Sequence, residues 1–551
     1  MEESKTITYP SVRKKDRYEI MYNQFRWRVP EYYNFGFDVV DQWAEDRTKL
    51  ALISIDRSGE KARYHTFYDL KVLSNQFANV LRNIGVKKGD RVLVILQSIP
   101  EWYVALIGMF KLGVVAMPGT VLLRSKDIEY RINRAEACMV LTDMDHAESV
   151  ELIRNKCPSL KYLMLVDGKR DGWISFDEEM KKASRNLKPS DVGRTRSDDP
   201  MLIYFTSGTT GPPKMVLHTH SYPLGHEVTA RFAQALTKCD LHWTVSETGW
   251  AKAAWGKLFG QMIVGAAIIQ WETPGRFDPD GLLQAMEKYG VTTFCAPPTV
   301  YRMLIQLDLS KYDLKLRHCM SAGEPLNPEV IRVWKKHFGL EIYDFYGQTE
   351  TVCVLSNYPF MPIKYGSVGK PTPGHDVRIV DDNGNELPPN EVGNIALYIG
   401  KERPPGLFKE YWKDEEAMKN AFRGDYYFTG DLGYKDEEGY FWFVGRKDDV
   451  IKSSGYRIGP FEVESALMEH DAVAECAVVG VPDPNGLRGN VVKAFIVLAK
   501  GYKPSDTLTK ELQDHVKKVT APYKYPRIIE YVDELPKTIS GKILRRELRK
   551  K

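Results

Sequence analysis

Apolar and polar positions alternate in two rhythms between about residues 60 and 400. Longer stretches such as 67–85 and 282–290 space their apolar residues as amphipathic helices do. Between them lie short apolar runs typical of buried strands, at 91–96, 137–143, 201–205, 266–271 and 292–297. Near-continuous apolar strands joined by helices predict an α/β fold of layered, largely parallel sheets.

The pattern changes after about residue 360, where turn residues become frequent. Residues 361–445 contain the turn sequence DDNGNE and strand-like runs such as NIALYIG, which predicts a smaller β-rich subdomain. A charged run, Arg-Lys-Asp-Asp, follows and is expected to act as a short hinge. Later residues alternate helix and strand patterns, as expected for a small, mobile α+β domain. We therefore predict an N-terminal domain over 1–445, a hinge at 446–449 and a C-terminal domain over 450–551.

No segment of the sequence is typical of a membrane span or of a disulfide-bonded protein. The longest apolar stretch, Tyr103 to Leu123, is interrupted by Lys, Gly and Pro, which predicts a buried helix followed by a strand. The seven cysteines are scattered and include no CxxC pair, so neither a disulfide framework nor a zinc site fits. The first residues lack the apolar core of a signal peptide. We expect a soluble, cytoplasmic protein without a transmembrane segment.

Composition and charge exclude further classes. The 551 residues are 43% hydrophobic and 27% charged, as in ordinary globular proteins. The net charge of +4 is too balanced for a nucleic-acid-binding protein, so no nucleic acid is expected. Residues 501–551 carry 13 Lys/Arg and 7 Asp/Glu, a local excess of +6. Such an excess is ordinarily a solvated face, but it could also meet a polyanionic ligand.

The strongest chemical motif follows the strand-like run MLIYF. Glycines in this motif allow the backbone to approach a ligand closely, and amide and hydroxyl groups can then bind phosphate oxygens. The spacing differs from that of a Walker P-loop. A flexible Ser/Gly loop is the alternative, which the position after a buried strand disfavours. The candidate phosphate-binding residues are Thr206, Ser207, Gly208, Thr209, Thr210, Gly211 and Lys214.

Several further motifs follow in order along the chain, and each alone could be a turn or a solvated charge cluster. Asp431 ends one of them and is a carboxylate suited to accept hydrogen bonds from a ribose diol. The motifs occupy Ser321–Pro325, Tyr343–Glu350, Tyr427–Asp431, Gly445–Asp449, Lys452–Arg457 and Pro536–Arg546.

In this order and spacing the motifs resemble those of the adenylate-forming superfamily, which includes acyl-CoA synthetases, peptide-synthetase adenylation domains and luciferases. The resemblance extends from about residue 35 to the end of the chain. GQTET, TAPYKYPR and ELPKTISGKI are similar to the medium-chain acyl-CoA synthetase branch. The resemblance implies a ligase that uses ATP, Mg²⁺ and CoA. A carboxylic acid would first become an acyl-adenylate with release of pyrophosphate, and its acyl group would then pass to CoA.

The resemblance also implies roles for single residues in the first step. Thr349 would bind the α-phosphate, Glu350 would ligate Mg²⁺, and Lys542 would bridge the carboxylate and the α-phosphate. Asp431 would hold the ribose, with Arg446 beside it. Besides the phosphate-binding residues and Asp431, the implied ATP- and AMP-binding set contains Gly323, Glu324, Pro325, Asp344, Phe345, Tyr346, Gly347, Gln348, Arg446 and Arg457.

For the second step the resemblance implies that the small domain rotates about Asp448. Lys542 would withdraw, and Ser454 and Gly455 would form the wall of the pantetheine tunnel. A glycine suits such a wall because a side chain would obstruct the thiol. The CoA phosphates could meet basic residues of the same domain, for which no motif selects among Lys517, Lys518 and Lys524.

The choice of acid depends on a candidate acyl pocket. Relatives specific for acetate carry Trp at the position of Gly347, so a glycine here argues against acetate. Lys252 could shorten or bend the cavity, favouring a medium-chain, branched, alicyclic or aryl acid. Trp250 and Trp255 could equally be core aromatics. The candidate pocket residues are Trp250, Lys252, Trp255, Gly256, Cys295, Gly323 and Gly347.

Other functions share parts of this pattern. A stand-alone adenylation enzyme would deliver its product to a carrier protein, a luciferase-like oxygenase would use O₂, and a non-catalytic homologue would only bind nucleotide. Intact Lys542, Glu350 and Asp431 argue against the last of these. The expected partners are therefore a small carboxylic acid, ATP and CoA. The sequence leaves open whether the protein forms a homo-oligomer.

Overall fold

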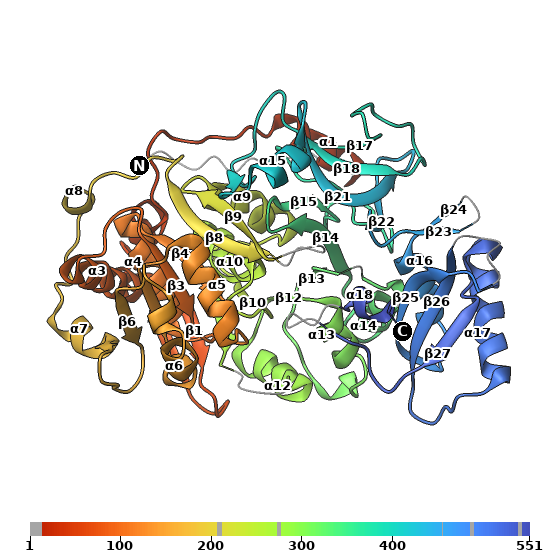
Figure 1. Ribbon diagram of the computed structural model, residues 1–551, viewed down its shortest axis with the longest axis horizontal. Coiled ribbons are helices and arrows are strands. Elements are labelled where there is room, and N and C mark those ends of the chain that lie inside the picture. Colours follow the sequence, from red (N-terminus) through yellow and green to blue (C-terminus); the bar gives the residue numbers. More distant parts are fainter. Residues whose placement is uncertain are drawn as a thin grey trace.

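The computed structural model describes residues 14–206, 212–272, 277–324, 326–453, 456–484, 490–537 and 543–550. Two large sheets with helices packed on them form most of the molecule, and a smaller antiparallel sheet lies beside them (Figure 1). The last hundred residues form a separate layer of helices and strands at one end, next to α13 and α14 (Figure 1). The predicted α/β fold class is confirmed.

The first large sheet has eight strands in the order β19-β9-β8-β4-β3-β5-β6-β7. Strands β3 to β8 pair in parallel, and β9 and β19 add to the edge antiparallel. These strands are apolar along their length because both faces are covered. In chain order they are β3 (Arg91–Ile95), β4 (Val115–Gly119), β5 (Met139–Thr142), β6 (Tyr162–Leu165), β7 (Ile174–Ser175), β8 (Pro200–Thr206), β9 (Lys214–Thr219) and β19 (Glu410–Tyr411).

The second large sheet has nine strands in the order β16-β15-β14-β13-β12-β10-β11-β1-β2. Its centre is parallel, and antiparallel strands close both edges. The strands are β1 (Leu50–Ile55), β2 (Ala62–Thr66), β10 (Leu241–Thr244), β11 (Ala267–Trp271), β12 (Thr293–Ala296), β13 (His318–Ala322), β14 (Ile342–Gln348), β15 (Val352–Ser356) and β16 (Lys370–Pro371).

Three smaller sheets follow along the chain. The β-rich part is a five-stranded antiparallel sheet, in which β22 pairs with β21. It contains β17 (Asp376–Val380), β18 (Gly393–Tyr398), β20 (Phe422–Arg423), β21 (Tyr426–Lys435) and β22 (Phe441–Arg446). The others are the hairpin of β23 (Ile451–Ser453) and β24 (Tyr456–Ile458), and the sheet of β25 (Val473–Pro482), β26 (Asn490–Leu498) and β27 (Ile528–Tyr531).

Helices begin and end at residues whose chemistry explains the boundaries. Thr66 and Asp69 form a capping box at the start of α3, and Gly85 ends it with φ +94°. The helices are α1 (Lys14–Gln24), α2 (Asp41–Trp43), α3 (Phe67–Ile84), α4 (Pro100–Leu112), α5 (Ser125–Ala135), α6 (Met144–Glu151), α7 (Phe176–Lys182), α8 (Pro189–Val192), α9 (Tyr222–Val228), α10 (Ala251–Lys257), α11 (Phe259–Val264), α12 (Pro279–Tyr289), α13 (Pro298–Leu304), α14 (Pro328–Phe338), α15 (Glu415–Ala421), α16 (Pro460–Met468), α17 (Asp506–Val519) and α18 (Arg545–Leu548). Single-turn segments are η1 (Gly36–Val40), η2 (Arg154–Lys156), η3 (Thr229–Ala233), η4 (Leu309–Lys311) and η5 (Pro522–Lys524).

The long apolar stretch from Tyr103 to Leu123 forms most of α4 and then β4, as predicted. Its helix lies in the main core, where nearly every residue is buried. In the described part of the chain, no helix combines the length and apolarity that a membrane span requires.

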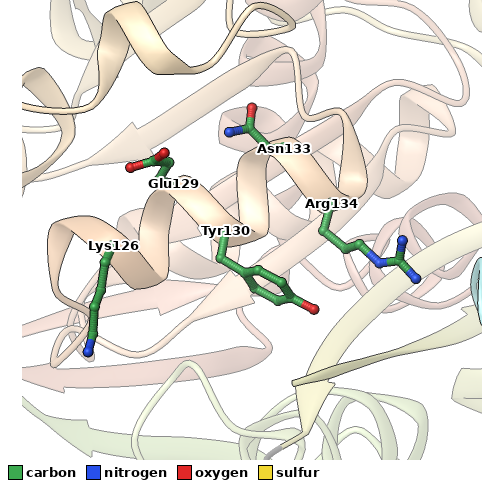
Figure 2. Close-up of a pocket in the computed structure, with 5 residues that line it drawn as sticks. All are labelled: Lys126, Glu129, Tyr130, Asn133 and Arg134. Carbon is green, nitrogen blue, oxygen red and sulfur yellow. The ribbon is translucent and has the colours of Figure 1, made fainter. Parts of the chain in front are cut away.

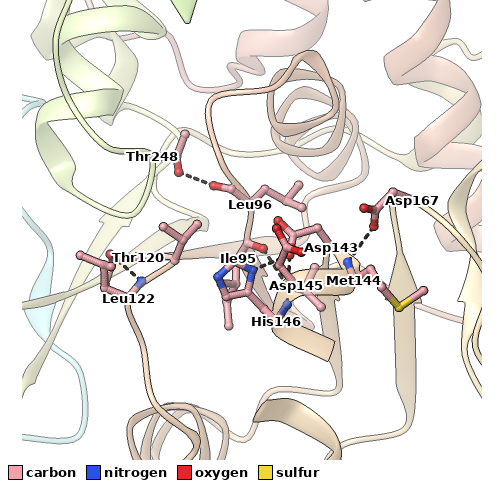
Figure 3. Close-up of polar contacts among 12 residues, drawn as sticks. Ile95, Leu96, Thr120, Leu122, Asp143, Met144, Asp145, His146, Asp167 and Thr248 are labelled. Atoms are coloured by element: carbon pink, nitrogen blue, oxygen red, sulfur yellow. Dashed lines mark hydrogen bonds and ion pairs between the residues drawn. The ribbon is translucent and has the colours of Figure 1, made fainter. Parts of the chain in front are cut away.

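The two large sheets contact each other through the loops that follow β3 and β4 in one sheet and β10 in the other. The hydroxyl of Thr248, after β10, donates to the carbonyl of Leu96, after β3 (Figure 3). Beside this contact, a Cβ on Gly249 would lie 2.0 Å from the backbone nitrogen of Thr120. Only glycine permits so close an approach, so this joint fixes how the two sheets sit against each other.

The N-terminal segment ties the β-rich part to the rest of the molecule. The hydroxyls of Tyr18 and Tyr22 donate to the carbonyls of Pro371 and His375 at 2.8 and 2.9 Å. The indole of Trp27 donates to another carbonyl of the same loop at 2.8 Å. These bonds join residues about 350 positions apart, which no local pattern in the sequence indicates.

Lys111 is a charged residue buried within the core. Lys111 of α4 has no exposed side-chain surface, and its ammonium bonds Asp41 Oδ1 and Asn75 Oδ1, each at 2.7 Å. Burial lowers the pKa of this lysine to about 8, and the attraction of Asp41 opposes that shift. The two close partners therefore stabilise the ammonium charge against a large desolvation cost.

We expect Lys111→Met to lower the free energy of unfolding by about 3 kcal/mol, because it leaves Asp41 buried without its cation. Lys182 is the control, since its bond to Glu179 is 2.8 Å long but its side chain is 68% exposed. Lys182→Met should change stability by less than about 0.5 kcal/mol. Urea unfolding at pH 7 measures both, and equal effects would refute the assignment of a stabilising buried pair.

Candidate active site

The hairpin between β14 and β15 carries the residues predicted to meet the α-phosphate and the metal. Thr349 and Glu350 lie in its three-residue turn. Val352, the first residue after the turn, has φ +60°. A β-branched residue rarely adopts this left-handed conformation. A Cβ on Gly347 would lie only 1.8 Å from the Val352 carbonyl oxygen. The glycine and the strained valine therefore define the shape of the turn together.

The predicted ribose carboxylate lies beside this hairpin. Asp431 Oδ2 accepts hydrogen bonds from the Tyr346 hydroxyl at 2.6 Å and from Gln348 Nε2 at 2.8 Å. The other end of the Gln348 amide accepts a bond from the Tyr427 hydroxyl at 2.9 Å. Arg446 stands opposite Asp431 in the pairing of β21 with β22. Residues predicted from separate motifs thus converge at one place.

Glu350 occupies a recessed position in the same turn. Its Oε1 accepts a hydrogen bond from the Tyr411 hydroxyl at 2.8 Å, and its carbonyl accepts one from the Phe408 amide at 2.7 Å. Burial raises the pKa of its carboxyl group. The Tyr411 bond and the positive charges of Arg446 and Lys214 lower the pKa and limit the rise. The Tyr411 hydroxyl and the two positive charges thus partly offset the cost of burying this carboxyl group.

Lys214 lies next to this carboxylate. It opens β9 and pairs with Thr206, the last residue of β8, so the chain returns to the same edge after the phosphate-binding motif. Its ammonium lies 4.8 Å from the centre of the Tyr411 ring. Ser207, Gly208, Thr209, Thr210 and Gly211 lie outside the described residues.

The backbone of the turn is held by a histidine that the sequence did not single out. His218 Nε2 lies 2.9 Å from the carbonyl oxygen of Thr349. Burial lowers the pKa of His218 to about 3, so the ring is neutral and Nε2 carries the donated proton. The Tyr222 ring packs with its centre 3.7 Å from the imidazole centre. Histidine on a strand forms no recognisable motif, so only the fold shows this contact.

Other predicted nucleotide-binding residues gather at the ends of β13 and β14. Gly323 has φ +102°, which suits the sharp turn after β13. Glu324 lies 3.6 Å from Arg302, and Pro325 is outside the described residues. Burial raises the pKa of Asp344 to about 8, and its Oδ2 accepts a long bond of 3.4 Å from the backbone amide of Leu326. Asp344 is thus buried in this region, and its contact with the nucleotide stays a prediction.

Apart from Gly323, the predicted acyl-pocket residues lie at α10 or on strands β12 and β14. Trp255 is only 6% exposed, and its ring lies 5.2 Å from that of Phe345. Lys252 Nζ donates to the carbonyl of Ala322 at 2.9 Å. Trp250 precedes α10, and Gly256 within that helix packs on Thr244. Cys295 is buried in β12, and Gly347 lies in β14. Their role as a pocket stays a prediction.

The described residues of the C-terminal part provide fewer of the predicted groups. The carbonyl of Asp448 accepts a bond from Arg549 at 3.2 Å, and Arg549 also pairs with Asp449. Leu544 N donates to Pro536 O at 2.8 Å, which brings together the described residues on both sides of 538–542. Ser454, Gly455 and Lys542 lie outside the described residues, as does the side chain of Arg457.

The candidate CoA-binding lysines already have partners in two cases. Lys517 pairs with Asp514 at 2.8 Å, and Lys524 pairs with Glu462. Neither pairing selects a phosphate site, so the choice among Lys517, Lys518 and Lys524 stays open.

A surface hollow lies along α5 (Figure 2). The hydroxyl of Tyr130 in this hollow donates to the carbonyl of Pro213 at 3.1 Å, so the hollow borders the chain just before Lys214. Its lining residues are Lys126, Glu129, Tyr130, Asn133 and Arg134.

Comparisons with known proteins agree with this geometry. The family model of the AMP-binding enzymes matches residues 39–412, and that of the AMP-binding enzyme C-terminal domain matches residues 462–542. The chain is 50% identical to the mitochondrial acyl-coenzyme A synthetase ACSM3 of Mus musculus, over 97% of this chain and 93% of the relative. It is 48% identical to the mitochondrial ACSM4 of Rattus norvegicus, over 95% of this chain and 91% of the relative.

Two solved structures of CoA ligases are also similar to this chain. The anthranilate CoA ligase AuaEII in complex with anthranoyl-AMP superimposes with a TM-score of 0.87 at 32% identity, covering 95% of this chain and 98% of that one. A benzoate CoA ligase from Burkholderia xenovorans LB400 superimposes with a TM-score of 0.83 at 30% identity, covering 94% of this chain and 100% of that one.

The comparisons correct one prediction. We expected a cytoplasmic protein, whereas these acyl-coenzyme A synthetase relatives are mitochondrial. The cysteine pattern and the apolar segments argue only against an oxidising compartment and a membrane span. They do not distinguish one reducing compartment from another, so the step from these patterns to the cytoplasm was wrong.

The match of both family models, the extended identity and the convergent hairpin confirm the predicted family and activity class. The chain belongs to the AMP-binding enzyme family and is an AMP-forming acyl-CoA synthetase of the adenylate-forming superfamily, with a carboxylic acid, ATP and CoA as its substrates.

Proposed function

We propose that this synthetase activates a medium-chain, branched, alicyclic or aryl carboxylic acid, and that the β14–β15 hairpin organises the adenylation step. The observation that carries this proposal is the convergence of Gln348, Asp431, Glu350 and Lys214 around one turn. Gln348 and Glu350 come from the β14–β15 hairpin of the nine-stranded sheet, and Asp431 comes from β21 of the five-stranded sheet. Lys214 ends the phosphate-binding motif and opens β9. Such an arrangement suits a nucleotide whose ribose and phosphates are held on either side of the turn.

The first step needs positioning more than proton transfer. A carboxylic acid with a pKa near ~4 is already ionised at neutral pH, so no general base is required. One carboxylate oxygen forms a bond to the α-phosphorus of ATP, and the bond to the pyrophosphate oxygen breaks. Thr349 would donate a hydrogen bond to the α-phosphate, while Lys214 and Lys542 would stabilise negative charge that grows in the transition state.

Glu350 fits a magnesium ion held mainly by the nucleotide. Mg²⁺ is usually bound by one or two carboxylates together with substrate phosphates and water. In the described ranges, no group of three or more His, Cys, Asp or Glu residues could hold a metal by itself. A single recessed carboxylate facing Lys214 is what a shared site requires. When bound, Mg²⁺ would neutralise charge on the departing pyrophosphate.

The second step transfers the acyl group to CoA. The thiol sulfur bonds to the acyl carbon, the bond from that carbon to the AMP oxygen breaks, and the thiol proton is released. We propose that the C-terminal residues rotate about Asp448 between the two steps, so that Ser454 and Gly455 replace Lys542 beside the adenylate. A rotation of this kind lets one site serve two reactions in turn.

Two of the structural relatives support an aryl acid among the candidate substrates, since one is an anthranilate ligase and the other a benzoate ligase. We expect the highest kcat/KM with a medium-chain, branched, alicyclic or aryl acid. A panel from acetate to decanoate, with 2-methylbutyrate, cyclohexane carboxylate and benzoate, measures this through CoA-dependent release of AMP. A maximum at acetate or at decanoate would contradict the proposed substrate class.

Lys542→Ala should slow adenylation by about a hundredfold or more, since it removes charge stabilisation from the transition state. Thioester formation from supplied acyl-adenylate and CoA should continue. Lys537→Ala is the control in the same segment, where Lys537 pairs with Glu475 at 2.9 Å, and it should leave both half-reactions intact. Equal loss of both half-reactions in Lys542→Ala would contradict the rotation.

Gly347→Ala separates two explanations for this glycine. A Cβ would meet the Val352 carbonyl at 1.8 Å, so the turn carrying Thr349 must shift. We expect adenylation to fall at least about tenfold with every acid, because a small misplacement of reacting groups is costly. Rates measured with acids of increasing size provide the test. Unchanged rates with short acids and losses only with bulky ones would show that the glycine merely provides pocket space.

A further inference from the structure

Tyr411 is the side chain that links the carboxylate of the hairpin to the lysine of the phosphate-binding motif. Its hydroxyl donates to Glu350 Oε1 at 2.8 Å. The ammonium of Lys214 lies 4.8 Å from the centre of its ring, within the range of a cation–π contact. Tyr411 therefore contacts both charged groups: its hydroxyl contacts the carboxylate of Glu350, and its ring contacts the ammonium of Lys214.

The backbone around Tyr411 is fixed on both sides. Strand β19 pairs antiparallel with β9, which sets Tyr411 opposite Val216, two residues after Lys214. The Phe408 amide donates to the carbonyl of Glu350 at 2.7 Å. The segment 408–411 thus holds Glu350 through its backbone as well as through the tyrosine hydroxyl, and its register determines where the ring meets the lysine.

Glu350 depends on this hydroxyl for its position. The hydroxyl of Tyr411 is the side-chain hydrogen-bond partner that the described residues provide for its carboxylate. In the part of the chain that the structure describes, no ion pair to Glu350 is formed at 4.0 Å or less. A buried carboxylate without a close cation is held in place by its hydrogen-bond donors.

We propose that Tyr411 is a positioning residue for the metal–triphosphate group: it holds the carboxylate of Glu350 in place and sets Lys214 beside it. The proposal rests on the proposed role of Glu350 in binding Mg²⁺ and extends it to a residue that carries no motif. Tyr411 would touch neither the metal nor the nucleotide. Its effect would pass through the two charged side chains that do.

A purely structural role is the competing explanation, since Tyr411 is only 8% exposed and its ring centre lies 4.7 Å from that of Phe408. Tyr440 is the matched control for that explanation. It is 3% exposed, its hydroxyl donates to the Pro362 carbonyl at 2.6 Å, and the ammonium of Lys364 lies 4.7 Å from its ring centre. It has the same kinds of contact without touching Glu350 or Lys214.

The test measures nucleotide binding to the full chain by calorimetry. The probe is α,β-methylene-ATP with Mg²⁺ or with EDTA, and AMP without metal gives the reference. Tyr411→Phe keeps the ring and removes the hydroxyl, so it should weaken Mg²⁺-dependent binding of the probe about tenfold or more and leave AMP binding unchanged. Tyr440→Phe should match the wild type in all three titrations.

A further measurement connects the effect to Glu350. In Glu350→Gln, which removes the charge, adding Tyr411→Phe should cause no further loss of Mg²⁺-dependent binding. Additive losses in the double variant would overturn the proposal.

The proposal is also overturned if Tyr411→Phe binds the probe as the wild type does, or if AMP binding falls equally. Failure of the underlying function would be recognised separately. In that case the wild type itself would bind the probe equally well with Mg²⁺ and with EDTA, before any variant is compared.

Discussion

The amide of Gln348 is the interaction on which the arrangement of the site depends. Its Nε2 donates to Asp431 Oδ2 at 2.8 Å and to the Thr429 carbonyl at 2.9 Å, while its Oε1 accepts from Tyr427. The amide has one donor end and one acceptor end, so it joins the nine-stranded sheet to the five-stranded sheet in a single orientation. The turn proposed to bind the phosphates and the carboxylate proposed to bind the ribose are thereby held at a constant separation.

The turn that follows Gln348 is constrained from several directions. Val352 has a strained backbone, His218 holds the Thr349 carbonyl, and the 408–411 segment holds Glu350. Strain of this kind persists only where the surrounding structure imposes it.

Local patterns predict much of this fold. The apolar runs at 91–96 and 201–205 are β3 and β8, and the amphipathic stretch 67–85 is α3 with its glycine end. Strand order and distant contacts leave no local signal, so the N-terminal tie and the β19–β9 pairing that places Tyr411 could not be predicted. Motifs mark Asp431 and Glu350, so the sequence could name them as candidates. His218 and Tyr411 carry no motif, and only the fold brings them into contact with the turn. The cytoplasmic location went beyond what the sequence patterns support.

Adenylation by this site requires that a carboxylate oxygen of the substrate attacks the α-phosphorus of ATP. A single turnover with an accepted acid labelled with ¹⁸O in its carboxyl group tests this directly, with mass spectrometry of the products. One labelled oxygen should appear in AMP and none in pyrophosphate. Label in inorganic phosphate, or unlabelled AMP formed together with acyl-CoA, would contradict it.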